Sequence, residues 1–256
     1  DVSHLVHRLA GIHLKENKKA LVRSRLMKRL RSLGLTSFDD YMALLSGEKG
    51  PAELGSMIDA ITTNKTGFFR EKAHFDYLST QVLPQLGGKM RFWSAACSSG
   101  QEPYTLAIAL RENLPAIDGQ DVKILATDIS AQMLAKAKTG VYPHPEVADI
   151  PPDLLCRYFI RGAGAAGGQF TVKAELRRLV TFGWINLMAA WPMKGPFDVI
   201  FCRNVMIYFD KATQQRLVNR FWELLSPDGY LFVGHAEGLS AIEHKFRYVQ
   251  PAVYIK

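Results

Sequence analysis

The segment from Arg91 to Leu110 constrains the fold more than any other part of the sequence. Its first residues, up to Ala96, form an apolar run that predicts a buried strand. Small residues ending at Gly100 predict a tight turn, and a helix with a proline in its first turn follows from Glu102. Such a unit directs a strand end and a helix N-terminus at one point, where backbone N–H groups can hold a polar or anionic ligand. An ordinary crossover turn is the alternative, because this turn has one glycine and a dinucleotide-binding loop has three.

A second apolar segment, residues 123–128, ends in the carboxylate of Asp128. In nucleoside-binding α/β sheets, an acid at the end of the second strand accepts hydrogen bonds from both ribose hydroxyls. A helix is expected over residues 129–138, so Asp128 and Ser130 could instead form its N-terminal cap. We favour the ribose interpretation, because a suitable strand and turn precede Asp128.

The overall composition indicates one large domain with a small accessory domain, since 256 residues can bury a full core. No apolar run approaches the roughly 18 residues needed to cross a bilayer, and no charged-then-apolar leader opens the sequence. We therefore expect a cytoplasmic protein that does not insert into the membrane. The net charge of +8 suggests an acidic partner, which could be nucleic acid, anionic lipid or an acidic protein surface.

The cysteines and histidines give no metal or disulfide pattern. Cys97, Cys156 and Cys202 are odd in number and widely spaced, which argues against a disulfide framework and a thiolate zinc site. The seven histidines lack the paired spacing of common metal motifs. We expect no metal and a reducing compartment.

Residues 1–63 predict an all-helical domain. Helices are expected over residues 2–11, 15–33, 37–45 and 52–63, with glycines between them. Four basic side chains share one face of the second helix, with Glu16 as the only acid expected nearby; they are Lys18, Arg25, Lys28 and Arg29. Either this is a solvated charged face, or it binds an acidic partner, because the imbalance exceeds what solubility requires.

A polar segment joins this domain to the central strand. Asn64, Thr66 and Arg70 are donors suited to a bound carboxylate or amino acid. The alternative is a linker fixed by Phe68 and Phe69. A helix is expected over residues 71–83.

The remaining sequence alternates strands and helices. Core strands are expected at 179–184, 197–202 and 230–234, a helix at 211–225, and one antiparallel edge strand at 248–255. This order predicts an α/β protein with a doubly wound, mostly parallel sheet. Three polar residues follow the 197–202 strand and would face the ligand crevice: Arg203, Asn204 and Tyr208.

An insertion interrupts this alternation. Proline-rich loops precede two short strands, at 157–161 and 170–173, on either side of a glycine-rich turn at 162–168. We expect an antiparallel β-subdomain here; a mobile surface loop is the alternative.

Five motifs together resemble the CheR family of chemotaxis receptor methyltransferases. They are residues 64–70, 93–104, 126–129, 197–209 and 229–235, and the resemblance extends from the basic helix to Gly238. It implies a class I methyltransferase-like fold with a receptor-docking helical domain, residues 1–63. An S-adenosylmethionine-binding catalytic domain, residues 64–256, would contain the β-subdomain at about 141–178. The implied reaction transfers a methyl group from S-adenosylmethionine to glutamate side chains on the cytoplasmic helices of bacterial chemoreceptors, leaving S-adenosylhomocysteine.

The resemblance also implies the site residues. Cofactor contacts would be Asn64, Thr66, Arg70, Glu102, Asp128, Asn186, Leu187, Arg203 and Asn204. Asp128 would bind the ribose and Glu102 the methionine amino group, while Asn186 and Leu187 would flank the adenine. Arg70 and Tyr208 would line the place where substrate meets the sulfonium and act as the catalytic pair. The β-subdomain resembles one that, in some members, takes up a receptor C-terminal peptide as an added strand.

The implied chemistry requires little from the protein. A glutamate side chain has an unperturbed pKa near 4.3, so the nucleophile is ionised at neutral pH and needs no general base. Catalysis would depend on alignment and on exclusion of water.

Three rival functions are less well supported. A nucleic-acid methyltransferase would carry a base-flipping Asn/Asp-Pro-Pro-Tyr/Phe motif where residues 203–206 lack it. A receptor-binding module without turnover is disfavoured by the intact Arg70, Glu102 and Asp128, and a nicotinamide dehydrogenase by the single-glycine turn. Nothing indicates an obligate dimer, so we expect a monomer.

Overall fold

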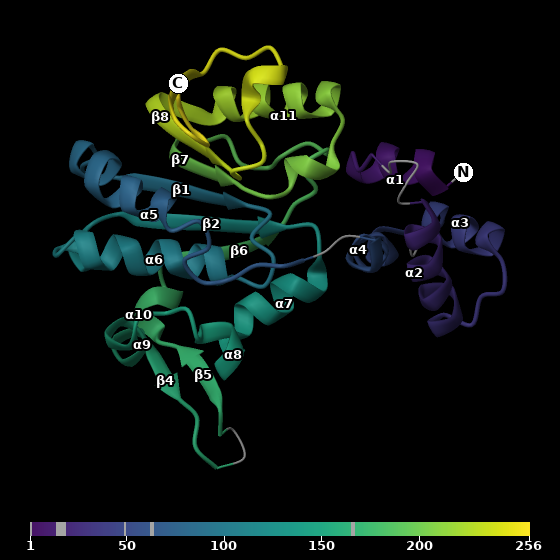
Figure 1. Ribbon diagram of the computed structural model, residues 1–256, viewed down its shortest axis with the longest axis horizontal. Helices are drawn as coiled ribbons and strands as arrows, with labels where there is room; N and C mark the ends of the chain where they lie inside the picture. Colours follow the sequence, from purple (N-terminus) through teal and green to yellow (C-terminus); the bar gives the residue numbers. More distant parts are fainter. Residues whose placement is uncertain (1, 14–18, 49, 62–63, 165–166) are drawn as a thin grey trace.

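The computed structural model of the chain describes residues 2–13, 19–48, 50–61, 64–164 and 167–256. The N-terminal part is helical, as predicted, and Figure 1 draws it to one side of the α/β part. Its helices are α1 (Val2–Ala10), α2 (Lys19–Ser32), α3 (Phe38–Ser46) and α4 (Gly50–Ile61). They pack around Leu26, Leu30, Tyr41 and Met57, each at most 1% exposed. Ser37 caps α3 by accepting a hydrogen bond from the Asp40 backbone N–H at 3.1 Å.

The α/β part contains a seven-stranded sheet in the order β6-β2-β1-β7-β8-β10-β9. The strands are β1 (Met90–Ala95), β2 (Val122–Asp128), β6 (Val180–Trp184), β7 (Phe197–Cys202), β8 (Leu225–Val233), β9 (Arg247–Gln250) and β10 (Val253–Ile255). The first five in this order pair in parallel, and β10 and β9 are antiparallel. The doubly wound, mostly parallel sheet is confirmed.

Helices cover both faces of the sheet (Figure 1). They are α5 (Ala73–Tyr77), α6 (Gln101–Asn113), α7 (Ala131–Thr139) and α10 (Ala174–Arg177) on one side and α11 (Lys211–Leu224) on the other, with short 3-10 turns at Ile117–Gly119, Met206–Tyr208 and Leu239–Ala241. Because side chains alternate along a strand, Phe92 packs in the core beneath α6, whereas Trp93 packs with Phe221 of α11. That second core continues into the helical N-terminal part.

Two predictions about this part were wrong in detail. Residues 248–255 do not form one edge strand, because a turn with Ala252 at a φ of 64° divides them into β9 and β10. The helix predicted over residues 71–83 changes pitch: α5 is followed by a π-helical turn at Leu78–Val82 and a 3-10 turn at Leu83–Gln85. Pro84 in that last turn has no N–H to continue the helix.

The insertion forms a separate antiparallel sheet in the order β3-β5-β4, next to α8 (His144–Val147) and α9 (Pro152–Tyr158). Its strands are β3 (Val141–Pro143), β4 (Phe159–Arg161) and β5 (Gln169–Val172). The antiparallel β-subdomain is confirmed, with β3 as a strand that the sequence did not predict, and Figure 1 shows it projecting below α7 and α10. The mobile-loop alternative for the strands was wrong.

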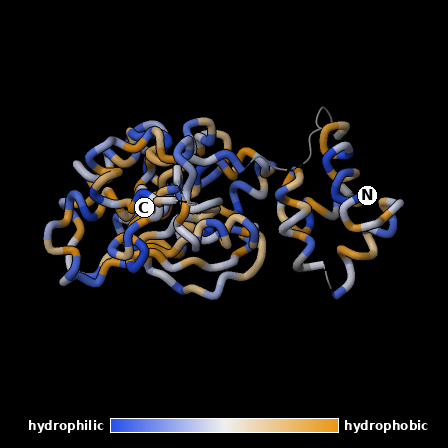
Figure 2. The backbone as a smooth tube through the Cα atoms, turned by 90° about the horizontal axis from the view of Figure 1, so that it is seen from below, coloured by the Kyte–Doolittle hydropathy of each residue, from blue (hydrophilic) through white to orange (hydrophobic). Residues whose placement is uncertain are grey.

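Hydrophobic and hydrophilic residues alternate along the helices of both parts (Figure 2). Of the helices that the structure describes, none combines the length and apolar character needed to cross a bilayer.

Candidate active site

A cavity lies at the carboxyl ends of β1, β2 and β7 and is closed on one side by the N-terminal helices. The structure brings every predicted cofactor-binding and catalytic residue to its wall: Asn64, Thr66, Arg70, Glu102, Asp128, Asn186, Leu187, Arg203, Asn204 and Tyr208. Ala10, Ile12, Ile58 and Asp59 line it from the N-terminal part.

The turn between β1 and α6 has an unusual backbone. Ala96 and Ser98 have φ angles of 71° and 49°, and Gly100 has a φ of 94°. A Cβ on Gly100 would lie 2.8 Å from the Ala137 Cβ and 2.9 Å from the Tyr142 hydroxyl oxygen. The single glycine of the turn is therefore required both by its conformation and by the close approach of α7.

Asp128 is oriented toward this turn. Its carboxylate accepts hydrogen bonds from the backbone N–H groups of Ser98 at 2.8 Å and Ser130 at 2.9 Å. Burial raises the pKa of Asp128, and these two donors oppose the shift. A carboxylate has about four acceptor sites, so these backbone bonds leave acceptor capacity for a ligand donor. The cap of α7 is Ser130, which accepts from the Met133 N–H at 3.1 Å, so Asp128 need not serve as one.

Glu102 lies in the first turn of α6 and is bound on both oxygens. The Ser94 hydroxyl donates to Oε1 at 2.7 Å, and Arg203 Nη1 donates to Oε2 at 3.1 Å. Burial raises the pKa of Glu102, while the Arg203 charge opposes the shift. The Glu102 carboxylate therefore lies at the cavity wall beside the guanidinium of Arg203.

Arg203 is shared with a second carboxylate, Glu71. Its Nε and Nη2 donate to Glu71 Oε2 at 3.2 and 3.0 Å, and Nη2 also donates to the Arg70 carbonyl. Asn204 Nδ2 donates to Glu71 Oε1 at 3.2 Å. The predicted cofactor residues Arg203 and Asn204 therefore bind protein carboxylates. Sequence reasoning missed Glu71, although its place directly after Arg70 and before a helix was a signal.

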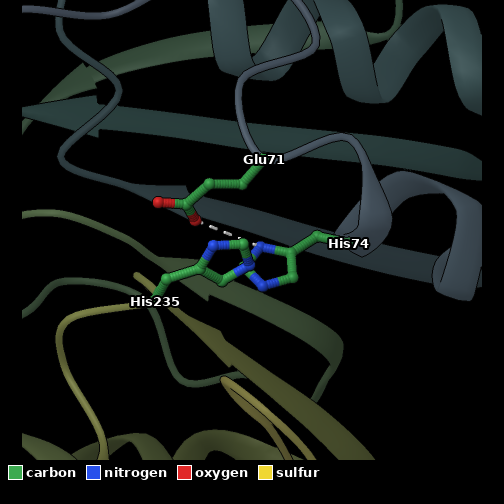
Figure 3. Close-up of side chains that lie close together, drawn as sticks. All are labelled: Glu71, His74 and His235. Atoms are coloured by element: carbon green, nitrogen blue, oxygen red, sulfur yellow. Dashed lines mark ion pairs between the residues drawn. The ribbon is translucent and has the colours of Figure 1, made fainter.

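Glu71 also belongs to a cluster with His74 and His235 (Figure 3), whose donor atoms lie within 4.8 Å of one another. His74 Nδ1 is 3.5 Å from Glu71 Oε2, and neither His74 ring nitrogen has a hydrogen-bond partner among the described residues. Burial and the nearby Arg203 charge lower the pKa of His74 to about 4, so it is neutral at pH 7. Nitrogen and carboxylate donors suit zinc, but the guanidinium already bound to Glu71 repels a cation. We assign no metal to this cluster.

The end of α1 and the segment that follows it cover part of the cavity. Asn186 Nδ2 donates to the Leu9 carbonyl at 2.6 Å, and the His13 N–H donates to the Tyr208 carbonyl at 2.7 Å. Between them, Ile12 forms an antiparallel bridge with Phe209. Residues of the predicted cofactor and substrate sites therefore also hold the N-terminal part in place.

Comparison with known families decides the classification. Residues 64–255 match the family described as CheR methyltransferase, SAM binding domain, and residues 1–62 match CheR methyltransferase, all-alpha domain. The chain belongs to the CheR methyltransferase family. It is thus a methyltransferase, with S-adenosylmethionine as the methyl donor, as the resemblance implied.

Named relatives of this CheR methyltransferase align over nearly its whole length. The "Chemotaxis protein methyltransferase" of Escherichia coli (strain K12) is 44% identical over 254 residues, covering 99% of this chain and 88% of the relative. "Chemotaxis protein methyltransferase 2" of Pseudomonas aeruginosa is 46% identical over 256 residues, covering 99% and 90%. The Borreliella burgdorferi "Chemotaxis protein methyltransferase" is 41% identical over 262 residues, covering 98% and 91%.

Arg70 and Tyr208, the predicted catalytic pair, reach the same cavity from different elements. Arg70 is exposed in the segment before α5, and its Nη1 donates to the Lys65 carbonyl at 2.7 Å. Tyr208 is half-buried at the end of the 3-10 turn that follows β7. Their common position is compatible with the predicted substrate role.

The predicted basic face of α2 is altered by an acid from another helix. Arg29 donates to both oxygens of Glu53 in α4, at 2.9 and 2.6 Å, and the Tyr41 hydroxyl donates to Glu53 at 2.7 Å. The expectation that Glu16 would be the only nearby acid was therefore wrong. Arg25, Lys28 and Arg29 line a shallow surface hollow. Lys18 lies outside the described residues.

Proposed function

We propose that this CheR methyltransferase methylates glutamate carboxylates on the cytoplasmic helices of chemoreceptors, in the sensory adaptation of chemotaxis. The products would be γ-glutamyl methyl esters and S-adenosylhomocysteine. One observation carries the proposal: a single cavity contains carboxylates suited to a nucleoside and an amino group, together with Arg70 and Tyr208 for a substrate carboxylate. The names of the relatives support the connection with chemotaxis.

Each side chain of the cavity has a proposed role in cofactor binding. Asp128 would accept hydrogen bonds from the ribose hydroxyls through the acceptor sites that Ser98 and Ser130 leave open. Glu102 would bind the methionine ammonium, and Asn186 and Leu187 would flank the adenine. The remaining proposed contacts are Asn64, Thr66, Arg70, Arg203 and Asn204.

The proposed methyl transfer is a direct displacement. The cofactor supplies an electrophilic methyl group on a sulfonium. The substrate carboxylate forms the new carbon–oxygen bond while the carbon–sulfur bond breaks, and no proton moves. Arg70 and Tyr208 would orient the carboxylate in line by hydrogen bonds, with alignment rather than base catalysis as the main contribution.

The helical domain and the β-subdomain are proposed to bind the receptor. Lys18, Arg25, Lys28 and Arg29 would attract acidic receptor helices and raise the encounter rate. In the β-subdomain, β5 lies between β3 and β4, so the outer side of β4 can accept a receptor C-terminal peptide as an added strand. We retain the division into residues 1–63 and 64–256, with the insertion at about 141–178. We also propose a cytoplasmic monomer that acts without a metal, nucleic acid or membrane insertion.

The test is transfer of labelled methyl from S-adenosylmethionine to receptor-containing membranes, with methanol released by base as the readout and RNA as a competing acceptor. Base-labile label on the receptor is expected. Label on RNA would contradict the proposed substrate. No transfer, in protein that binds the cofactor, would favour either a receptor that is not its substrate or a binding module without turnover.

The Arg70→Ala variant tests the proposed catalytic role. We expect it to fold and to bind the cofactor more weakly, because Arg70 is also a proposed cofactor contact. At saturating cofactor it should lose on the order of a hundredfold in kcat, as removal of one transition-state hydrogen-bond donor does in other enzymes. Arg157→Ala, which removes an exposed arginine paired with Glu112 outside the cavity, is the matched control. Full turnover by Arg70→Ala with cofactor bound would remove Arg70 from the mechanism.

A further inference from the structure

Glu71 lies behind the cavity, not among the residues that line it, and its side chain is only 14% exposed. Between Glu71 and the cavity lies Arg203, whose side chain is 2% exposed. We propose that Glu71 is a positioning residue: by holding Arg203, it keeps the Glu102 carboxylate available to the amino group of S-adenosylmethionine. This inference rests on the proposed role of Glu102.

The contacts of Arg203 are divided unequally between the two carboxylates. Nε and Nη2 both donate to Glu71, at 3.2 and 3.0 Å, and Nη2 also donates to the Arg70 carbonyl. Only Nη1 reaches Glu102, at 3.1 Å. The guanidinium also lies over the rings of Phe75 and Phe201, 5.5 and 6.0 Å from their centroids. These contacts fix Arg203 mainly on the side of Glu71.

This division affects how Glu102 can bind a ligand. A buried guanidinium requires a carboxylate partner, because an unpaired buried charge is costly. Without Glu71, Arg203 would satisfy that requirement with Glu102 alone and would form a tighter, bidentate pair. The same Glu102 lone pairs would then be less available to a ligand ammonium. Glu71 therefore prevents Arg203 from competing with the cofactor.

The backbone at Glu71 supports a role beyond packing. Glu71 has a φ of 56° and Phe69 a φ of 53°, so two non-glycine residues within three positions adopt the left-handed conformation. Such residues are uncommon and concentrate at functional sites. The strained segment directs the Glu71 carboxylate to Arg203 and to Asn204 Nδ2.

The test is a double-mutant cycle in the full chain with Glu71→Gln, Glu102→Gln and the double variant, using S-adenosylhomocysteine as the calorimetric probe. We expect Glu71→Gln to raise Kd about tenfold, equivalent to about 1.4 kcal/mol. In the Glu102→Gln background, the same change should have little effect, because the two residues act through one interaction. With saturating cofactor, kcat should stay close to that of the wild type.

The pH dependence of binding provides a readout that a general loss of structure would not give. Glu102 must be ionised to bind an ammonium, so cofactor affinity should fall as the pH drops through the pKa of Glu102; we call this fall the acid limb of the binding profile. Because burial raises the pKa of Glu102, the acid limb lies above the pH range usual for a glutamate. The titratable groups that act on Glu102 are Arg203, Glu71, Cys97 and Cys202. Removal of the negative charge of Glu71 should lower the pKa of Glu102 and move the acid limb to lower pH.

Two further variants serve as controls. Glu112→Gln removes a carboxylate from the same helix as Glu102, where it pairs with Arg157 at 2.6 and 2.8 Å, and should leave Kd unchanged. Glu71→Asp retains the charge with a shorter side chain. It should keep the acid limb of the binding profile near its wild-type position but raise Kd, because the shorter side chain no longer reaches Arg203 as Glu71 does. If Glu71→Gln does not fold, an unchanged Kd in Glu71→Asp would overturn the inference.

Other outcomes would overturn the inference in distinguishable ways. Equal effects of Glu71→Gln in both backgrounds, or a lower melting temperature with unchanged Kd, would make Glu71 a structural residue. Zn²⁺ binding that depends on Glu71, without any effect on the cofactor, would make the cluster in Figure 3 a metal site instead. An unchanged Kd in Glu102→Gln would refute the proposed role of Glu102, and this inference with it.

Discussion

The molecule contains two arginine–glutamate clusters that look alike locally and differ in their surroundings. In the helical part, Arg29 donates to both oxygens of Glu53, and Tyr41 donates to the same carboxylate. At the cavity, one arginine, Arg203, serves two carboxylates. In the first cluster, the side chains of Arg29, Tyr41 and Glu53 hydrogen-bond to one another. The second leaves Glu102 at a cavity wall, where we propose that it binds the methionine ammonium. We attribute the difference between the two clusters to the sharing of the arginine.

The titration behaviour of the two clusters differs as well. Burial alone would raise the pKa of Glu53, but hydrogen bonds from Arg29 and Tyr41 lower it overall. At Glu102, burial dominates and the pKa is raised. The hydrogen bonds to Glu53 outweigh its burial and stabilise the anion, whereas at Glu102 burial outweighs the donors Ser94 and Arg203.

The largest effect should come from removal of the shared arginine. Arg203→Ala would leave two carboxylates without their cation, at a cost of about 3–5 kcal/mol, and should abolish cofactor binding. Thermal unfolding and calorimetry would measure both quantities. Near-normal cofactor affinity in this variant would contradict the contrast between the two clusters.

Removal of the acid in the structural cluster should affect stability alone. Glu53→Ala should cost about 1–3 kcal/mol, because it leaves the Tyr41 hydroxyl buried without its acceptor. The affinity for S-adenosylhomocysteine should not change. A parallel loss of affinity would show that the two clusters are not independent.

Acid titration should reveal the depressed pKa of Glu53 as a pH-dependent contribution to stability. The folded-state pKa of Glu53 is depressed, so its contribution to stability is fully present above its unfolded-state pKa, near 4.3, and is lost as the pH falls through the lower folded-state value. The stability difference between wild type and Glu53→Ala should therefore be constant from pH 7 to about pH 5 and shrink below about pH 4. Denaturant unfolding across this range measures it, and a difference that grows in acid would refute the assignment.

Charge reversal on α2 should have the smallest effect. Arg25→Glu with Lys28→Glu should raise KM for the receptor on the order of tenfold and leave cofactor affinity unchanged, with an effect that diminishes at high salt. These positions are better probes than Arg29, whose replacement would also leave Glu53 without its cation. An unchanged KM at low salt would favour a merely solvated face.

The sequence predicted the cavity better than it predicted the contacts within it. Asp128 and Glu102 could be located because apolar strands and a turn precede them, and parallel strands bring their carboxyl ends to one edge. The pairing of Arg203 with Glu71 joins residues 132 positions apart, and no local pattern encodes it. Glu53 was missed because the side on which α4 meets α2 depends on packing. Strand β3 has only three residues, too few for a periodic signal.

The bonds that join Leu9 to Asn186 and His13 to Tyr208 have a thermodynamic consequence. Because the same residues help to hold the helical part and to line the cavity, any ligand that changes how that part is seated also changes the free energy of occupying the cavity. Linkage makes this coupling reciprocal. If the proposed receptor helix changes this seating when it binds α2, it also changes the affinity for donor and product, and exchange of product for donor then changes the affinity for the receptor by the same factor.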